Sequence, residues 1–169
     1  MAPPRCVLVL DPAAPRWLIA NAAAVLGASI GAGGRVALGP DTADAAGARW
    51  PGIAEVVVPV LAADPAGLAA LRAAAADAGV TVLAFPDLAQ TARTYADYAA
   101  ALGRTPTADV RIHGLALLGP SNAVRRLAEA SSLALVGCAR ATAVLNGELA
   151  SSLTCDLAAL GDPVPEPVA

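Results

Sequence analysis

The segment DPAGLAALRAAAADAGVTVLAF, residues 64–85, joins a helix with clear boundaries to a strand, and it decides the fold class. Asp64 is a residue type that caps helix N-termini, and Pro65 suits the first helical position. Gly79 can adopt the left-handed conformation that ends a helix. Between them, apolar side chains recur at helical spacing: Leu68, Leu71 and Ala75. The pattern predicts a helix over residues 65–78 that leads directly into a strand.

The same alternation of strands and helices extends in both directions from this segment. Short apolar runs predict strands at Cys6–Leu10, Arg35–Gly39, Ala54–Leu61, Val80–Phe85 and Val110–Gly119. Helical spacing predicts helices at Trp17–Ile30, Thr94–Leu102 and Ser121–Ala130. Pro59 lacks a ladder donor, which puts its strand at a sheet edge or the proline at a strand end. Residues 40–52 are rich in Pro, Asp and Gly and are expected to form a loop.

This order predicts an α/β protein with a small mixed, mostly parallel sheet and helices on both faces. Uniformly apolar strands such as Cys6–Leu10 are typical of a sheet that is covered on both sides. Residues 1–137 are expected to form a single domain. Residues 138–169 are expected to add a C-terminal extension, with short helices followed by a proline-rich tail.

The composition excludes several classes of function. The net charge is −3 with a pI near 5.0, which argues against tRNA or another nucleic acid as a partner. All eleven basic residues are arginines, so chemistry that needs a lysine, such as Schiff-base formation, is excluded. The three cysteines follow no metal-binding spacing, so neither a metal nor a cofactor is expected.

No membrane segment or signal peptide is expected. The first apolar run is short and is interrupted by Asp11. Residues 18–34 are apolar but contain Asn21, Ser29 and several glycines, and they fall short of a membrane-spanning length. A cytoplasmic protein is the expectation.

Polar side chains gather where predicted strands end, which is where α/β proteins place their functional groups. The candidate ligand-binding residues are Asp11, Arg16, Asn21, Gln90 and Ser121, and the candidate catalytic residues are Asp87 and Thr91. If the strands are parallel neighbours, these groups face one crevice. Asn21 is expected to be half-buried at the border of the apolar face of its helix.

Each candidate also has a purely structural interpretation. Asp87 with Thr91 fits a helix cap followed by an exposed hydroxyl, Asp11 fits a turn before Pro12, and Ser121 fits a helix cap. His113, the single histidine, lies inside a predicted strand and is interpreted as structural.

Three motifs in order carry a resemblance to a known family: CVLVLD…LIANAAAVLGASIG, FPDLAQTARTYADY and LALLGPSNAVRRL. Over residues 5–136 the chain resembles an uncharacterised bacterial family catalogued as domain of unknown function two thousand. That family is similar to the type II peptidyl-tRNA hydrolases, which implies a small mixed sheet sandwiched by helices. Pairing is common among those hydrolases, which implies a homodimer.

The resemblance extends to individual residues. Asp87 and Thr91 keep the spacing of an Asp-to-Thr turn in the hydrolases, with Ala89 in place of its glycine. The later hydrolase motif is matched by Leu115, Ala116, Gly119 and Pro120. The hydrolases carry lysines after the first strand, whereas Arg16 is the single cation there in this chain.

Three hypotheses of function remain open. The first is a cytoplasmic protein that binds a small molecule or a peptide-like ligand at strand ends. The second is an ester or amide hydrolase, in which Asp87 orients a water or Thr91 and amides near Gly119 and Ser121 stabilise an oxyanion. The third is a structural or assembly protein whose alanine-rich helix faces pack between subunits.

Overall fold

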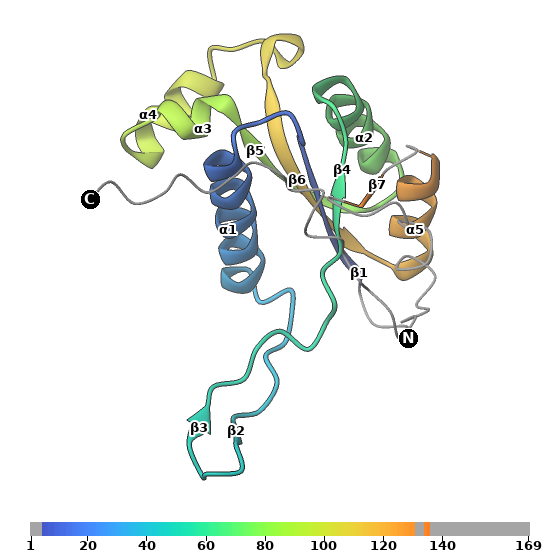
Figure 1. Ribbon diagram of the computed structural model, residues 1–169. Coiled ribbons are helices and arrows are strands. Elements are labelled where there is room, and N and C mark those ends of the chain that lie inside the picture. The colour runs from blue at the N-terminus through green and yellow to red at the C-terminus, as the bar shows by residue number, and fades with distance from the viewer. Residues whose placement is uncertain (1–4, 131–133, 136–169) are drawn as a thin grey trace, which may run out of the picture.

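The chain folds around one main sheet with helices on both faces, as Figure 1 shows. The computed structural model describes residues 5–130 and 134–135, so the expected extension over residues 138–169 lies outside the described part. The strands in spatial order are β5 (Thr81–Pro86), β6 (Ile112–Gly119), β1 (Arg5–Leu10), β4 (Val60–Ala62) and β7 (Ala134–Leu135). The helices are α1 (Arg16–Ala32), α2 (Pro65–Asp77), α3 (Asp87–Thr91), α4 (Tyr95–Leu102) and α5 (Ser121–Ala130), and a 3-10 turn, η1 (Thr107–Asp109), precedes β6. The predicted α/β class is confirmed.

The sheet is mixed, but the prediction that it is mostly parallel is wrong. Among the described strands only β1 and β4 pair in parallel, whereas β6 is antiparallel to both of its neighbours, β1 and β5, and β7 is antiparallel to β4. Parallel pairing requires a crossover that returns the chain to the starting end of the sheet. Helix α1 lies in such a crossover between β1 and β4. The segment with α3, α4 and η1 instead stays at the end where β5 stops, so β6 enters the sheet from that end (Figure 1).

This topology defines one end of the sheet, called the site end below, where β1, β4 and β5 finish and β6 begins. The first turns of α1, α2 and α3 lie at the same end, because each follows one of the three finishing strands. Helix α5 follows β6 and therefore starts at the opposite end (Figure 1).

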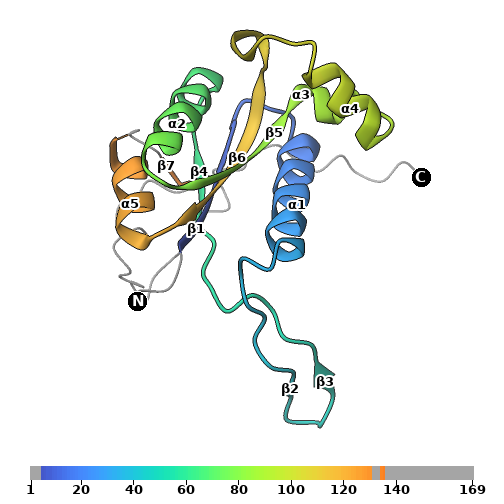
Figure 2. The same ribbon diagram turned by 180° about the vertical axis from the view of Figure 1, so that it is seen from behind.

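The core has two layers, one on each face of the sheet. Figure 2 shows α1 on one face and α2 and α5 on the other. Residues of β1 alternate between them, because successive side chains of a strand point to opposite faces. Cys6, Leu8 and Leu10 pack with the buried stripe of α1, whereas Val7 and Val9 pack with α2 and α5. Burial of a Leu or Val side chain contributes about 2 kcal/mol each, so both faces of β1 stabilise the fold.

The predicted helices form close to their expected bounds. At the start of α2, Asp64 Oδ1 accepts a hydrogen bond of 2.7 Å from the Gly67 amide, and past its end Gly79 has a φ of +66°. Helix α4 begins with a reciprocal capping box in which Thr94 and Asp97 satisfy one another's backbone amides. These caps explain why local sequence located the helices accurately.

Residues 35–58 form a protruding hairpin, called the arm below, instead of a sheet strand and a loop. Its strands are β2 (Thr42–Ala43) and β3 (Arg49–Trp50), and the Leu38–Ala54 bridge continues the pairing toward the body. The expected strand Arg35–Gly39 is therefore no part of the main sheet. The later expected strand shortens to β4, which begins just after Pro59 and lies between β1 and β7. The sequence allowed Pro59 either in an edge strand or at a strand end, and the structure places it at a strand end.

No helix in the described ranges is long and apolar enough to span a membrane.

Candidate functional site

A polar pair ends an otherwise apolar row at the site end of the sheet. Opposite residues of β1 and β6 are Val7 with Leu117 and Val9 with Leu115. Two residues further on, the Asp11 amide donates a 3.0 Å hydrogen bond to the His113 carbonyl, so Asp11 and His113 are the next pair in this row. By strand alternation the Asp11 side chain lies on the same face as Val7 and Val9, which α2 covers, whereas the pairing with β5 shifts register at His113. Asp11 is 0% exposed and His113 is 8% exposed.

The hydrogen-bonding capacity of this pair is only partly used. Asp11 Oδ1 accepts a hydrogen bond of 2.9 Å from the Ala13 amide. Asp11 Oδ2 lies 3.5 Å from Nη2 of Arg111, an ion pair whose arginine is 56% exposed. Neither Asp11 Oδ2 nor His113 Nδ1 has a hydrogen-bond partner within residues 5–130 and 134–135. A buried polar atom without a partner costs about 1–3 kcal/mol, so this pair calls for an explanation.

Asp87 approaches the same residues from the other side of β6. It directly follows β5, and its amide donates a 3.0 Å hydrogen bond to the Arg111 carbonyl. The half-buried Asp87 carboxylate accepts a 2.8 Å hydrogen bond from the Leu88 amide. Asp11 and Asp87 therefore flank the start of β6 on its two sides, with Arg111 and His113 between them.

The other two residues of the predicted cluster after β5 are more peripheral. Thr91 and Gln90 are exposed on α3, and the Thr91 hydroxyl donates a 3.4 Å hydrogen bond to the Leu88 carbonyl. The structure thus brings Asp87 to the polar pair, whereas it leaves Thr91 and Gln90 on the surface.

Helix α1 carries two of the candidate residues, Arg16 and Asn21. Arg16 is exposed at the first position of α1 and therefore lies at the site end. Asn21 is exposed, so the prediction of a half-buried side chain is wrong. The helix packs through a narrow stripe at intervals of four residues, namely Leu18, Ala22, Leu26 and Ile30. This stripe leaves the side that carries Trp17 and Asn21 facing outward.

Ser121 lies at the wrong end of the sheet for the predicted crevice. It starts α5 just after β6 ends, and β6 is eight residues long. At about 3.4 Å per residue, Ser121 lies on the order of 25 Å from His113. The expectation of one crevice shared by all strand ends is therefore wrong for Ser121, because β6 runs antiparallel to its neighbours. The amides near Gly119 cannot serve Asp87 as an oxyanion site for the same reason.

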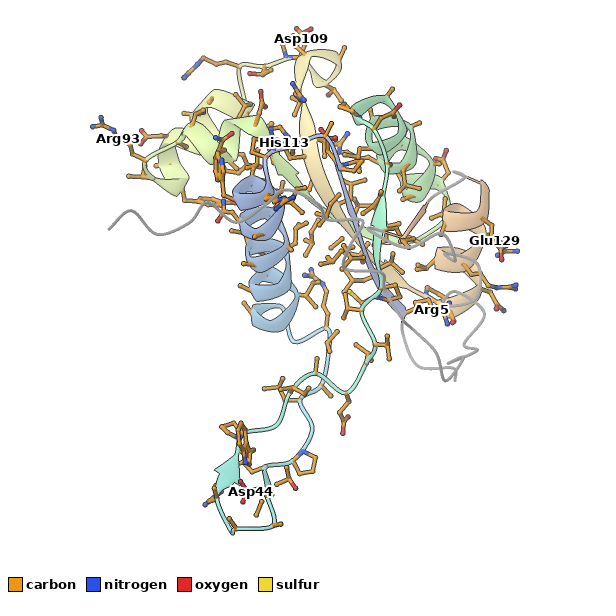
Figure 3. All side chains as sticks on the ribbon, in the orientation of Figure 1. Arg5, Asp44, Arg93, Asp109, His113 and Glu129 are labelled. Carbon is orange, nitrogen blue, oxygen red and sulfur yellow. The ribbon has the colours of Figure 1, made fainter. Side chains whose placement is uncertain are left out.

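The start of α2 completes the surroundings of the polar pair. The Ala63 amide donates a 3.1 Å hydrogen bond to the Leu10 carbonyl, which places the first turn of α2 beside the end of β1. Figure 3 labels His113 at this end of the molecule and Asp109 in the turn that precedes it.

Sequence reasoning missed Arg111 and His113 as site residues. The expected strand began at Val110, which placed His113 in a strand interior, whereas β6 begins at Ile112. The signal in the sequence was the pair of polar residues, Arg111 and His113, at the start of an otherwise apolar run. No group of three or more His, Cys, Asp or Glu side chains suited to a metal ion occurs in the part of the chain that the structure describes.

Comparisons with known proteins agree with the fold and name no activity. A solved structure of a protein of unknown function from Agrobacterium tumefaciens strain C58 superposes with a TM-score of 0.70 at 16% sequence identity. The match covers 80% of this chain and 98% of that one. Comparison with curated proteins gives no match. The model of the family described as "Protein of unknown function (DUF2000)" matches residues 4–134, and the chain therefore belongs to this family.

Proposed function

We propose that the protein binds a small peptide-like ligand at the site end of its sheet. The observation that carries this proposal is a pair of buried atoms, Asp11 Oδ2 and His113 Nδ1, that have no hydrogen-bond partner among the described residues. A carboxylate oxygen only accepts hydrogen bonds, whereas a histidine Nδ1 donates one when it carries the proton. A peptide group offers one donor and one acceptor, so it can satisfy both atoms at once.

Charged residues near the polar pair can bind further groups of the ligand. Arg111 is half-exposed beside the pair, and its guanidinium can hold a carbonyl or carboxylate oxygen of a ligand. Asp87 sits on the other side of the Arg111 backbone and can accept from a second ligand amide. Arg16 at the start of α1 supplies a further positive charge at this end of the sheet.

The resemblance supports the same class of ligand. We further propose that the fold is related to that of the type II peptidyl-tRNA hydrolases, whose small mixed sheet is also sandwiched by helices, and that the protein acts in the bacterial cytoplasm. The acidic chain has no lysine, which favours a short peptide or amide over a tRNA as the ligand.

A screen by protein-observed NMR tests the proposal, with dipeptides, N-acyl amino acids and simple amides as probes. Asp11→Asn and His113→Gln are expected to weaken the dissociation constant of a hit at least tenfold, about 1.4 kcal/mol. The matched control is Ser121→Ala, which alters a polar side chain at the opposite end of the sheet and leaves binding unchanged. Failure of every probe, or a hit that binds both site variants as tightly as the native chain, refutes the proposal.

Hydrolysis of an ester or amide is the second candidate, and the position of His113 favours it. A buried histidine next to a carboxylate suits general-base activation of a water, and Arg111 can stabilise the oxyanion that forms. Asp87 and Thr91 then take supporting roles in place of the catalytic ones first expected.

Acyl-peptide esters and peptidyl-tRNA analogues test this candidate by product release. The His113→Gln chain is expected to lose about 100-fold or more in rate, whereas Thr91→Ala changes the rate little. Turnover that survives His113→Gln at the native rate eliminates His113 as the base.

A further inference from the structure

Exposed apolar side chains concentrate on two elements of the molecule. Of the large hydrophobic residues that are exposed in the described ranges, all but Tyr95 belong to α1 or to the arm. The arm carries Leu38, Trp50, Ile53 and Val57, and α1 carries Trp17 and Val25. Ile53 reaches 81% exposure. Single exposed apolar residues are ordinary, but a cluster confined to two elements indicates an interaction surface.

Side-chain hydrogen bonds and an ion pair give the arm a defined local structure. At its tip, Asp44 Oδ1 accepts hydrogen bonds of 2.9 Å from two amides of the turn, and Asp44 Oδ2 accepts one of 3.1 Å from Trp50 Nε1. Nearer the body, Arg49 and Asp41 form an ion pair at 2.9 Å. These bonds hold the hairpin in shape although it has no core of its own.

The closest approach of the two arm strands requires glycine. A side chain at Gly52 would collide with the backbone of Gly39 on the opposite strand. An isolated two-stranded hairpin is at best marginally stable in water. A protruding hairpin with this much specific local structure therefore gains stability when another surface covers it.

The outer side of α1 is the matching surface. No charged residue occurs from Trp17 to Gly34, and the exposed side of α1 beyond Arg16 carries two polar side chains, Asn21 and Ser29, among apolar and small ones. Only the stripe through Leu18, Ala22, Leu26 and Ile30 is buried against the sheet. The outer side of α1 is uncharged and exposes Trp17 and Val25, so a surface that covers these two side chains stabilises the molecule.

The arm of one copy cannot supply this cover for its own α1. The arm leaves the body beyond the last turn of α1 and points away from it in both views (Figures 1 and 2). The length of the arm matches the length of α1, however, so the arm of a second copy can cover the helix. One side of the arm, residues 35–44, spans roughly 33 Å when extended, and the 17 residues of α1 span roughly 26 Å.

We propose that two copies of this chain form a homodimer by exchanging arms, each arm packing along the outer side of its partner's α1. A two-fold axis near the base of the arm places both contacts at once, because the arm continues in the direction in which α1 ends. Every surface in this contact comes from the same chain, so the interface is self-complementary.

The apolar area fits a stable dimer. The register that pairs Thr42 with Trp50 and Leu38 with Ala54 puts Leu38 and Trp50 on one face of the arm and Ile53 and Val57 on the other. The face with Ile53 and Val57 packs on Trp17 and Val25 of the partner's α1, and at on the order of 100 Å² for each side chain the two contacts bury about 800 Å² of apolar surface. A standard interface buries about 1,600 Å², of which somewhat more than half, about 900 Å², is apolar. The contact of both arms with both α1 helices thus reaches the size of a specific interface.

Sedimentation equilibrium of the full chain tests the proposal. The native chain is expected to have twice the single-chain mass of 16.6 kDa at micromolar concentration. Ile53→Glu in the arm and Val25→Glu on α1 are each expected to return the mass to one chain, with unchanged circular dichroism. The matched control, Tyr95→Glu, alters the exposed apolar residue outside both elements and leaves the dimer intact. A native chain that stays monomeric at 100 µM overturns the proposal, and so does a dimer that both Glu variants retain.

Disulfide cross-linking tests which surfaces meet. Chains with Val25→Cys are mixed with differently tagged chains carrying Ile53→Cys and then oxidised, with a Tyr95→Cys and Ile53→Cys mixture as the control. A covalent heterodimer above the control level supports arm exchange. A disulfide formed within one chain, in a protein that carries both Val25→Cys and Ile53→Cys, shows that the arm folds onto its own helix and overturns it.

Discussion

Replacing His113 with leucine is expected to stabilise the ligand-free protein. His113 is 8% exposed, and its Nδ1 atom has no hydrogen-bond partner within the described ranges. A buried polar atom in that state costs about 1–3 kcal/mol, and a leucine of similar volume removes the cost. Part of this gain is offset by imperfect packing of the new side chain, so we expect a net gain of about 1 kcal/mol. The melting temperature should rise by about 2–4 °C for a chain of this length.

Urea unfolding at constant pH, followed by circular dichroism, measures the change. His113→Gln is the matched control, because it keeps a polar side chain in the same place and is expected to bring no gain. Stabilisation by leucine together with loss of ligand binding shows that the histidine is kept for function at a cost in stability. If His113→Leu instead lowers the free energy of unfolding by more than about 1 kcal/mol while His113→Gln does not, the imidazole is already satisfied in the free protein and the reasoning fails.

Three further results are expected from single groups elsewhere in the fold. Asp64→Ala removes the cap on the Gly67 amide, so the free energy of unfolding should fall by about 1 kcal/mol and the melting temperature by about 3 °C in a thermal scan. Hydrogen bonds from the Trp50 indole and the turn amides lower the pKa of Asp44. Ionised Asp44 therefore stabilises the arm tip fully above the usual carboxylate pKa, and this stabilisation is lost as the pH falls through the lowered pKa. In NMR spectra the Trp50 indole proton should stay unshifted from neutral pH to about pH 4 and move only below it. Burial raises the pKa of the Cys6 thiol, so alkylation of Cys6, read by peptide mass spectrometry, should be slow at pH 8 in the folded chain and rapid in urea, and fast labelling without urea would show that β1 opens.

Helices whose ends are marked by capping residues could be predicted from the sequence, whereas the direction of a strand could not. Helix α2 begins after Asp64 and is followed by Gly79, and both signals act within one turn of chain. The direction of β6 depends instead on where the chain returns after α3 and α4, which no local pattern encodes. The arm was missed for a related reason. Its apolar residues, such as Leu38 and Ile53, imitate sheet strands in sequence although they are exposed in the folded chain.

The sequence predicted those residues of the candidate site that follow the end of a strand and missed those that precede the start of one or stand near it. Asp11 and Asp87 do reach one end of the sheet, because each directly follows a strand and those two strands run in the same direction. Arg111 and His113 belong to the start of a strand, and the rule that functional groups follow strand ends passes over such positions. A reversed strand brings its first residues to the same end as the last residues of its neighbours. In any mixed sheet, polar residues at the start of a strand therefore merit the same attention.

The two proposed surfaces place opposite demands on the chain, and α1 connects them. Just before the first turn of α1 stands Asp11, whose buried Oδ2 has no hydrogen-bond partner in the described ranges, and there a small ligand gains from hydrogen bonds. Along its outer side, α1 presents apolar area without charge, where a second copy gains from the removal of water. An alanine-rich helix suits both tasks, since small side chains allow close approach of the sheet on one side and of an arm on the other. The scarcity of charge in α1 then follows from its position between two contacts, and a single charge at Val25 should disturb assembly while leaving the polar pair intact.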